Sequence, residues 1–479
     1  MDFFRFSHLW LIYSLPFEPF SALSSNRCGY RNGFYSSVQQ RYIRNLRFKM
    51  SSKPYLIFTA LHESHIQAAV VCAHSQNLQK KIRSAGHDYE GLSYVAKVPF
   101  FILDMFMLRS IHIDMETETA WVQTGATLGE VVYRIYEKSK THGFPVGVCP
   151  TVGVGFSGGG YGNMMRKYGL SVDNIIDAQI VNVKGKLLDR KSMGENQFWA
   201  IRGGGGASIG VVVSYKIKIV RVPKTVTIFR VAKTLDQNAI DIVYQWQHVA
   251  DKLDNNLFIR LILNVQVNET DSQKTGRATF HALFLGDTDK LLLVMKKSFP
   301  ELGLKKSDCN ETSWAQSVLI FWTKSTLGTA NVHDLLNRTQ DLVYFKRKSD
   351  NLKKPISKDG LEVIWKRLIE LQNVALTFNP YGGRMAEILA EESRFPHRAG
   401  NLAKIQYAVD WHEAGKEDYY INLTRKLYSY TTHMCPRIQE WHFSTTKILT
   451  WVSITTERTV TRKEKFMESS ISRVISRGW

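Results

Sequence analysis

Residues 147–170 read GVCPTVGVGFSGGGYGNMMRKYGL and place a dense run of glycines around one cysteine, Cys149. Glycine permits a backbone with positive φ and leaves room for a ligand to touch main-chain N–H groups. A surface loop is the alternative, but it would expose Phe156, Tyr161 and Met164, which interleave with the glycines. Consecutive free N–H groups suit a pyrophosphate, especially where a helix begins. The run therefore favours a phosphate-containing cofactor, although neither the P-loop pattern nor a dinucleotide fingerprint is present.

The length and charge of the chain limit the classes of protein to which it can belong. Its 479 residues, 44% of them apolar, suffice for two domains that each bury a core. No apolar run reaches the roughly eighteen residues of a membrane span, so we expect no membrane span. The formal net charge is +20, but Lys and Arg are scattered and no nucleic-acid-binding motif is present. We therefore expect a basic surface among acidic cell-wall polymers and no nucleic-acid partner; a basic protein that binds nucleic acid or pectin is the least favoured alternative.

The cysteines do not form a recognisable framework. Their odd number and wide spacing fit neither a disulfide scaffold nor a zinc site, so we expect no metal. A single disulfide between Cys28 and Cys72 is compatible with the sequence if the protein is secreted. The five cysteines are Cys28, Cys72, Cys149, Cys309 and Cys435.

Hydrophobic periodicity predicts a mixed α and β architecture. Before the glycine run, YLIF, LQKKIRS, FILDM, SIHID and AWVQTGA are typical of strands, whereas HESHIQAAVVCAHSQ has helical spacing. TLGEVVYRIYEKSK predicts a helix that Thr127 opens, with Glu130 completing a capping box. Beyond the run, IIDAQIVNV, KGKLLD and IGVVVSYKIKIVRV are rich in β-branched residues, with a hairpin turn near Lys184 and Gly185.

The composition shifts after Pro223. VTIFRVA, LFIRLILNVQV, ATFHALFLG and AKIQYAVDW predict strands, and AIDIVYQWQHVADKL, DKLLLVMKKSF and GLEVIWKRLIELQ predict covering helices. Strand pairs with covering helices indicate a separate α+β domain.

Five motifs together resemble the plant berberine-bridge-enzyme-like oxidases, from about Tyr35 to Tyr430. They are IRSAGHDYEGLSY, GVCPTVGVGFSGGGYG, FWAIRGGGGASIG, NPYGGRMAEI and KIQYAVDW. The resemblance implies an α+β fold: a PCMH-type FAD-binding domain of two α+β subdomains, like that of vanillyl-alcohol oxidase, and a substrate domain with an antiparallel sheet covered by helices. It places these domains at 51–226 and 227–430, after an N-terminal segment 1–50.

The resemblance implies a bicovalently bound FAD. In the family, the His of the first motif bonds the flavin 8α-methyl carbon and the Cys of the second bonds C6, which correspond to His87 and Cys149. Two bonds would hold the reactive N5 of the flavin in hydride-transfer range of a substrate. The other residues that the resemblance places at the cofactor are Arg83, Ser84, Ala85, Gly86, Asp88, Gly153, Gly155, Ser157, Gly158, Gly159, Tyr161, Gly162 and Val183.

The reaction that the resemblance implies is removal of hydride from a C–H next to an oxygen, in an alcohol such as a hydroxycinnamyl alcohol or in a sugar, with O2 reoxidising the flavin. The matching catalytic positions are Tyr161, Tyr89, Gln406 and Lys404. A phenol needs a lowered pKa to act as a base near neutral pH, and we expect the Lys404 cation to lower that of a nearby tyrosine. Val152 lies where the family gates oxygen access, and its small side chain favours an oxidase.

Three features depart from the family pattern. Where family members commonly read VGVGGHFSGGG, this chain lacks the Gly-His pair between Gly155 and Phe156, a shortening of up to about 7 Å of extended chain. Ala85 replaces a glycine of the first motif. In family members, the chain returns to the FAD domain through a segment that residues 431–479 replace here. If the reading frame is shifted by one base, synonymous codons for this tail can encode the family-like sequence VSKNPRVAFFNYKDLDLGINN. We hypothesise that this tail is out of frame, which transcript sequencing across codons 425–440 tests; an inactive family remnant is then the alternative to an enzyme.

The resemblance also implies a monomer secreted to the apoplast or cell wall, with a small-molecule substrate and O2 as its partners. The N-terminus has the apolar stretch and small residues of a signal peptide, but Asp2, His8 and Pro16 depart from that pattern, and the usual apolar segment ending in a cysteine is absent. Glycosylation sequons permit secretion without proving it, and they begin at Asn268, Asn310, Asn337 and Asn422.

Overall fold

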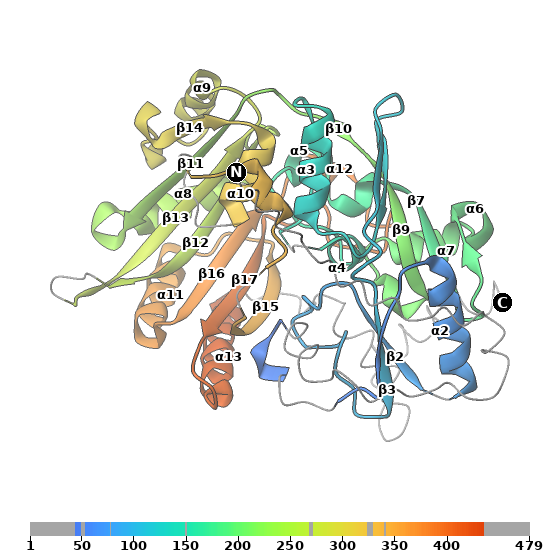
Figure 1. Ribbon diagram of the computed structural model, residues 1–479. Coiled ribbons are helices and arrows are strands. Elements are labelled where there is room, and N and C mark those ends of the chain that lie inside the picture. Colours follow the sequence, from blue (N-terminus) through green and yellow to red (C-terminus); the bar gives the residue numbers. More distant parts are fainter. Residues whose placement is uncertain are drawn as a thin grey trace, which may run out of the picture.

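The computed structural model describes residues 44–48, 53–76, 78–148, 151–267, 272–322, 329–339 and 342–434. Two lobes lie side by side (Figure 1): an N-terminal lobe, residues 53–222, and a C-terminal lobe, residues 226–434. Cys28, Cys149, Cys435, the Asn268 sequon and the tail beyond residue 434 lie outside the described residues.

The N-terminal lobe begins with a small parallel sheet in the order β1-β3-β2. Parallel neighbours need a crossover, and α2 supplies it between β1 and β2. All five residues of the central strand β3 are buried, which matches its uninterrupted apolar sequence FFILD. The elements are β1 (Ile57–Thr59), α2 (Glu63–Ser75), β2 (Gln79–Arg83) and β3 (Phe100–Asp104).

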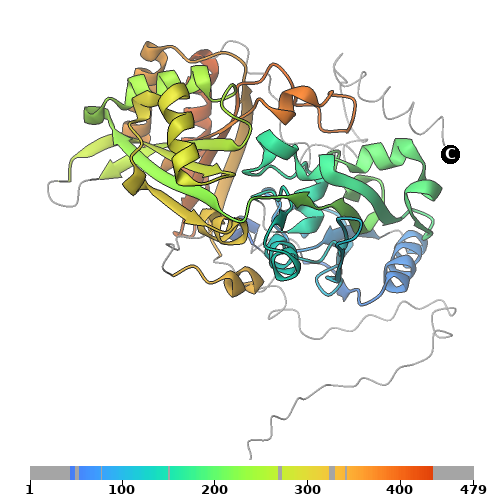
Figure 2. The same ribbon diagram turned by 90° about the horizontal axis from the view of Figure 1, so that it is seen from above.

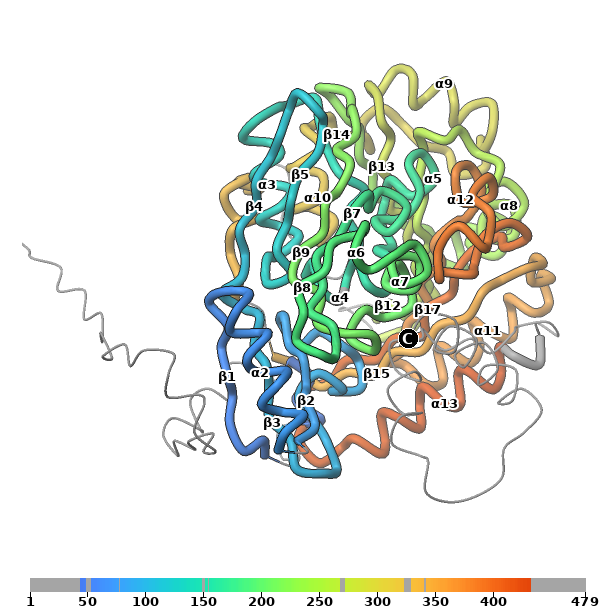
Figure 3. The backbone as a smooth tube through the Cα atoms, turned by 90° about the vertical axis from the view of Figure 1, so that its right-hand side faces the viewer, coloured from blue at the N-terminus to red at the C-terminus, as the bar shows by residue number. Residues whose placement is uncertain are grey.

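A five-stranded antiparallel sheet in the order β4-β5-β9-β7-β8 completes this lobe above the α2 unit (Figure 3). The predicted capping box is confirmed: the amide of Glu130 donates to Thr127 Oγ1 at 3.0 Å and that of Thr127 to Glu130 Oε2 at 2.8 Å. The strands are β4 (Ile111–Asp114), β5 (Thr119–Gln123), β7 (Ile175–Val181), β8 (Leu187–Leu188) and β9 (Val211–Lys218), with β6 (His142–Gly143) pairing β10 (Val220–Arg221). The helices are α3 (Leu128–Lys138), α4 (Val152–Ser157), α5 (Met165–Tyr168), α6 (Arg190–Met193) and α7 (Glu195–Ile201).

The C-terminal lobe is a seven-stranded antiparallel sheet in the order β14-β11-β13-β12-β16-β17-β15, which confirms the predicted α+β class. Helices cover the face that points away from the N-terminal lobe (Figure 1). The strands are β11 (Val226–Thr234), β12 (Leu257–Val267), β13 (Lys274–Phe284), β14 (Cys309–Thr312), β15 (Tyr344–Leu352), β16 (Val374–Pro380) and β17 (Ala403–Trp411). The helices are α8 (Ala239–Val249), α9 (Thr288–Ser298), α10 (Trp314–Trp322), α11 (Lys358–Leu371), α12 (Arg384–Glu387) and α13 (Glu417–Met434).

The face of this sheet that points toward the N-terminal lobe carries a polar row. Side chains alternate between faces, so residues in register on neighbouring strands share a face. Pairing aligns Arg260 with His281, and a 2.8 Å hydrogen bond joins Arg260 Nε to Asn379 Oδ1. The whole row runs through Arg230, His281, Arg260, Asn379, Lys404 and Asn351. The fold therefore gathers cations on the inner face of the sheet.

The two lobes are joined by buried charged groups. Arg398 donates from both Nη atoms to the Asp173 carboxylate at 2.9 and 2.7 Å, and both side chains are buried. Arg166 of the N-terminal lobe donates to backbone carbonyls of the C-terminal lobe, including that of Leu257 at 3.0 Å. Figure 2 shows the segment around α12 extending over the N-terminal lobe. One apolar core crosses the predicted boundary at residue 226, because α10 and α12 pack into the N-terminal lobe.

Two further expectations concern the surface. Within the described part of the chain, no helix has the length and apolar character needed to cross a membrane. Cys72 is disulfide-bonded, whereas the expected partner Cys28 lies outside the described residues. Three of the sequon asparagines are exposed, namely Asn310, Asn337 and Asn422.

We predict that Asp173→Asn destabilises the fold by about 3–5 kcal/mol, because it leaves the buried Arg398 cation without its counter-ion. Urea unfolding followed by circular dichroism measures the effect. The control is Glu195→Gln, which removes an equally bidentate but exposed partner of Arg190 and is expected to leave the free energy of unfolding nearly unchanged. Equal effects of the two substitutions would contradict a structural role for the Arg398–Asp173 pair.

Candidate functional site

The first motif begins at a buried ion pair at the ends of two parallel strands. Arg83 and Asp104 are in register as the last residues of β2 and β3, and Arg83 Nη1 lies 2.7 Å from Asp104 Oδ1. Burial raises the pKa of Asp104, and the Arg83 cation offsets part of that shift. The pair fixes the point from which residues 84–94 leave the sheet.

Three consecutive backbone amides after this ion pair have no acceptor among the residues that the structure describes. The N–H groups of Ala85, Gly86 and His87 donate no hydrogen bond to any described residue. Gly86 has φ +68°, a left-handed conformation that turns successive amides toward the same side. Buried backbone amides are normally paired, so an unpaired run indicates a place for an anionic ligand. Ala85, which replaces a family glycine, is not among the residues with positive φ.

His87 is enclosed next to these amides. Its Nε2 atom is buried and has no hydrogen-bond partner among the described residues. Burial, together with the Arg44 and Arg83 cations, lowers the pKa of His87 to about 3. The imidazole is therefore neutral at physiological pH and keeps a nitrogen lone pair available for a bond.

Asp88 closes the loop that carries these groups. Its carboxylate accepts hydrogen bonds from the amides of Leu92 and Ser93 and from the Ser93 hydroxyl. These bonds hold the pKa of Asp88 down, but burial outweighs them and raises it overall. Asp88 therefore stabilises the conformation of the loop that carries His87.

The second motif packs directly on the first. A Cβ at Gly153 would lie 2.2 Å from Ser84 Oγ and 3.0 Å from Ser84 Cβ, so the missing side chain allows the two motifs to pack closely. Ser157 Oγ donates to the Gly153 carbonyl at 2.6 Å and lies 2.8 Å from the Tyr215 hydroxyl. Gly158, partly buried, follows at the end of α4.

The amides at the start of α4 differ from the expectation that this run leaves them free. Those of Val152, Gly153 and Gly155 donate to the carbonyls of Ala126, Thr124 and Thr151 at 2.9–3.2 Å. The glycines here serve close packing, and the unpaired amides lie in the first motif instead.

Two further glycines bring Tyr161 to the seam between the lobes. Gly159 has φ +120°, and its missing Cβ makes room for the Phe395 ring at 2.9 Å. A Cβ at Gly162 would lie 1.8 Å from the Val146 carbonyl oxygen. Gly159 thus lets the chain approach the C-terminal lobe, and Gly162 lets it pass close to the backbone of its own lobe.

Tyr161 lies against Lys404 of the facing sheet. Lys404 Nζ lies 4.7 Å from the centre of the Tyr161 ring, and both side chains are buried. Burial, helped by the nearby Arg260 cation, lowers the pKa of Lys404 to about 7. Burial and the neighbouring Tyr381 raise the pKa of Tyr161 well above its ordinary value. Arg398 is the cation that lowers the Tyr161 pKa, and burial outweighs it, so the expected lowering of a tyrosine pKa by Lys404 is not found at Tyr161.

Tyr89 and Gln406, two other predicted catalytic residues, contact each other. Gln406 Nε2 donates to the Tyr89 hydroxyl at 3.3 Å, and the Tyr89 ring stands edge-on to Phe345 at 5.8 Å. Lys404 and Gln406 are two residues apart on β17 and so share its inner face. The structure thus brings all four predicted catalytic residues to one side of β17.

Sequence reasoning missed several residues of this site. Arg260 lies partly buried in the polar row and also donates to Asn163 Oδ1 at 3.3 Å, and Tyr381 packs on Tyr161 with ring centres 5.8 Å apart. Tyr381 lay inside the quoted motif NPYGGRMAEI, which was the available signal, whereas cross-strand register alone identifies Arg260. Val183 lies in the β7–β8 turn with its side chain 52% exposed.

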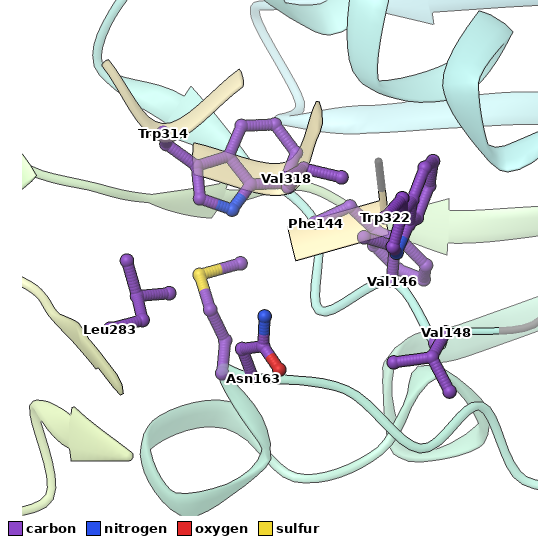
Figure 4. Close-up of a pocket in the computed structure, with 10 residues that line it drawn as sticks. Phe144, Val146, Val148, Asn163, Leu283, Trp314, Val318 and Trp322 are labelled. Atoms are coloured by element: carbon purple, nitrogen blue, oxygen red, sulfur yellow. The ribbon is translucent and has the colours of Figure 1, made fainter. Parts of the chain in front are cut away.

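A pocket with mainly apolar walls adjoins this group (Figure 4). Trp314 and Val318 of α10 face Leu283 and Asn163 across it, and Val148 lies at its other side. Asn163, which lines the pocket, accepts a hydrogen bond from Arg260 of the polar row. Its lining residues are Phe144, Val146, Gly147, Val148, Asn163, Met164, Leu283, Trp314, Val318 and Trp322. Within the described residues, no group of three or more His, Cys, Asp or Glu side chains is placed to hold a metal ion.

Comparison with known proteins gives one consistent family. Residues 54–190 match the family model described as an FAD binding domain. The chain is 59% identical over 407 residues to berberine bridge enzyme-like 8 of Arabidopsis thaliana, covering 84% of this chain and 77% of that protein. Among solved structures it is similar to berberine bridge enzyme-like 28 of Arabidopsis thaliana, with 40% identity, a TM-score of 0.81 and coverage of 86% and 85% of the two chains.

A second solved structure bears on chemistry. The wild-type pollen allergen Phl p 4.0202, described as a glucose dehydrogenase, is 38% identical with a TM-score of 0.80 and covers 86% of this chain and 83% of its own. An isoleucine-to-valine variant of Phl p 4 is described as a glucose oxidase.

We predict that Gly153→Ala destabilises the protein by about 1–3 kcal/mol, because its new methyl group overlaps Ser84 Oγ. The double variant Gly153→Ala with Ser84→Gly removes the overlapping atoms and is expected to recover most of the loss. Thermal unfolding and the flavin-to-protein absorbance ratio measure both effects. Failure of the second substitution to restore either quantity would show that the two motifs do not pack as described.

Proposed function

The chain belongs to the berberine bridge enzyme-like family of FAD-dependent oxidoreductases, and we propose that it removes hydride from the C–H next to the hydroxyl of a small alcohol. The observation that carries this proposal is the meeting of Tyr161 with Lys404 beside Gln406 and Tyr89, at the seam where the FAD-binding lobe faces the sheet. Bound FAD supplies the hydride acceptor. The protein residues supply binding, orientation and a place for the hydroxyl proton.

The residues present fit FAD. We place its pyrophosphate on the unpaired amides of Ala85, Gly86 and His87, where a doubly charged ligand satisfies otherwise unpaired donors. Arg83 stands at the start of this loop, Asp88 shapes it, and the Ser84–Gly153 contact holds the second motif against it. The buried Nε2 of His87, without a partner among the described residues, supports His87 as one attachment point.

Cys149 is the second proposed attachment point. It lies outside the described residues, but the residues on either side are anchored: the amide of Val148 donates to the Tyr161 carbonyl at 2.8 Å, and Thr151 forms a β-bridge with Thr127. The missing Gly-His pair falls beyond these anchors, where Gly155 still closes the turn of α4 onto Thr151. The shortening therefore leaves the two anchors of the thiol in place.

Proton acceptance is assigned to the Tyr161–Lys404 pair. Tyr161 holds its own proton at neutral pH, because burial raises its pKa, whereas Lys404 with a pKa of about 7 is half neutral there. Tyr161 can take the substrate proton only as its own proton leaves, and neutral Lys404 is the neighbouring group able to receive it. Gln406 on this sheet face and Tyr89 on the facing loop then orient the substrate hydroxyl.

The pocket beside α10 favours an alcohol with an apolar part. Aromatic and aliphatic side chains line it, with Asn163 as the polar end nearest Arg260. We therefore propose a hydroxycinnamyl alcohol rather than a sugar, because the residue types beside α10 are mostly apolar. Comparing kcat/KM for 4-hydroxycinnamyl alcohol and D-glucose tests the assignment, and a preference for glucose would overturn it.

Reoxidation by O2 and secretion complete the proposal. We propose that Val152, which is fully buried, is the residue that gates oxygen access, and the description of an isoleucine-to-valine variant of Phl p 4 as a glucose oxidase supports a small side chain at such a gate. The disulfide at Cys72 and the exposed sequon asparagines support an oxidising, extracellular setting.

We predict that His87→Ala combined with Cys149→Ala yields protein that releases all its flavin on acid precipitation, since both covalent bonds are gone. The wild-type precipitate stays yellow, and each single variant retains colour through the remaining bond. Absorbance of the supernatant at the flavin band measures release. Colour that stays with the doubly substituted chain would show that attachment occurs elsewhere.

We predict that flavin reduction by substrate accelerates as pH rises through about 7, because neutral Lys404 accepts the proton and its pKa is lowered to about 7. Below pH 7 Lys404 is protonated and the rate falls. Anaerobic stopped-flow measurements with 4-hydroxycinnamyl alcohol from pH 5 to 9 give the profile. Lys404→Met is expected to be slower at every pH and to lose this step; an unchanged step would assign it to another group.

A further inference from the structure

A short segment near the N-terminus, Arg44–Phe48, contacts both lobes. Figure 1 shows its 3-10 turn η2 (Leu46–Phe48) beside β15, on the side of the N-terminal lobe. Asn45 forms a parallel β-bridge with Val343, and the amide of Leu46 donates to the Val343 carbonyl at 3.1 Å. The segment is thus attached to the sheet of the C-terminal lobe, although it precedes the N-terminal lobe in sequence.

Within this segment, Asn45 uses the whole hydrogen-bonding capacity of its side-chain amide. Its Nδ2 donates to the carbonyls of Tyr89 at 3.2 Å and Phe345 at 3.1 Å. Its Oδ1 accepts from the amides of Phe345 at 3.4 Å and Arg47 at 3.2 Å. A primary amide has two donors and two acceptor positions, and Asn45 fills all four while fully buried.

Neighbouring contacts fasten the same loop at other points. Arg44 Nε donates to the Ala85 carbonyl at 3.4 Å, and Glu90 pairs with both Arg47 and Lys346. Gly91 has φ +70° and lies so close to the Phe48 ring that a Cβ there would approach it to 2.9 Å. The loop that carries His87 and Tyr89 is therefore held against the edge strand of the facing sheet.

We propose that Asn45 is a positioning residue: it holds the loop that carries His87 and Tyr89 so that the Tyr89 hydroxyl contacts Gln406. Asn45 grips the Tyr89 carbonyl and the backbone of Phe345, the residue whose ring packs against Tyr89. Only an amide of this length offers donors to two carbonyls and an acceptor to the Phe345 amide. This role rests on the proposed function of Tyr89 and Gln406, and it adds the residue that holds them in place.

The test compares Asn45→Asp with a matched control in the flavin-loaded full chain. Asn45→Asp keeps the shape of the side chain, removes both donors and sets a carboxylate against two carbonyl oxygens. The control is Gln247→Glu: buried Gln247 makes the same reciprocal pair with the backbone of Ile356, at 3.2 and 2.8 Å, within the helical layer of the C-terminal lobe. Asn45→Ala, which adds no charge, serves if the aspartate variant does not fold.

Hydrogen exchange gives a readout that does not depend on turnover. We expect the amides of 86–94 and 343–349 to exchange about tenfold faster in the Asn45 variant, and those segments to be unchanged in the Gln247 variant. Equal acceleration in both variants, or none at 86–94, overturns the proposal.

A kinetic cycle with 4-hydroxycinnamyl alcohol then tests whether Asn45 acts through Tyr89. Asn45→Asp and Tyr89→Phe are each expected to lower kcat/KM about tenfold, and the double variant no further, because both substitutions disturb the same hydroxyl. A loss of kcat/KM of about a hundredfold in the double variant, the product of the two single losses, overturns the positioning role. A wild-type enzyme that leaves the alcohol unoxidised contradicts the proposed function instead, and the exchange result alone then decides the role of Asn45.

Discussion

The exclusion of water from the seam between the lobes is the constraint on which the site depends. Tyr161 belongs to the N-terminal lobe, yet its surroundings are Tyr381 and Phe395 of the C-terminal lobe and the Lys404 cation. If the lobes separated, each of these groups would return to water and lose its shifted pKa. The buried Arg398–Asp173 pair and the carbonyl contacts of Arg166 keep the seam closed. The contacts that stabilise the interface between the lobes therefore also maintain the shifted pKa values of the site.

Desolvation also explains why the shifted groups move toward their neutral forms. Burial lowers the pKa of His87 to about 3 and that of Lys404 to about 7, and it raises that of Tyr161. Neutral groups are what the proposed chemistry requires, because an imidazole needs a lone pair to bond carbon and an amine needs one to accept a proton. Sequence reasoning looked for a cation that acidifies a tyrosine, and it overlooked that the same dry surroundings discharge the cation.

The sequence predicted the helices and strands better than the tertiary contacts between them. Apolar runs such as FFILD and the Thr127–Glu130 box read correctly because they depend on neighbours along the chain. The strand β15, YFKRKSDNL, escaped notice because its polar residues are explained only by strands that follow it. Arg260 and Asn45 were missed for the same reason. The position of Arg260 depends on the strand register across the sheet, and that of Asn45 depends on a partner 300 residues away. The family motifs located Tyr161, Lys404, Tyr89 and Gln406, and the structure pairs them.

The inner face of the sheet shows what the site costs in stability. Lys404 is buried and Arg260 partly so, and Arg260 has no carboxylate partner among the described residues. The carbonyl oxygens of Asn379 and Asn163 supply dipoles to Arg260 where an acid would supply a full charge. A carboxylate there would stabilise the cation more strongly, but it would also hold the proton on Lys404 and raise its pKa away from neutrality. Amides in place of acids therefore keep the row electropositive and leave Lys404 able to lose its proton near pH 7, at the expense of stability that the rest of the fold must supply.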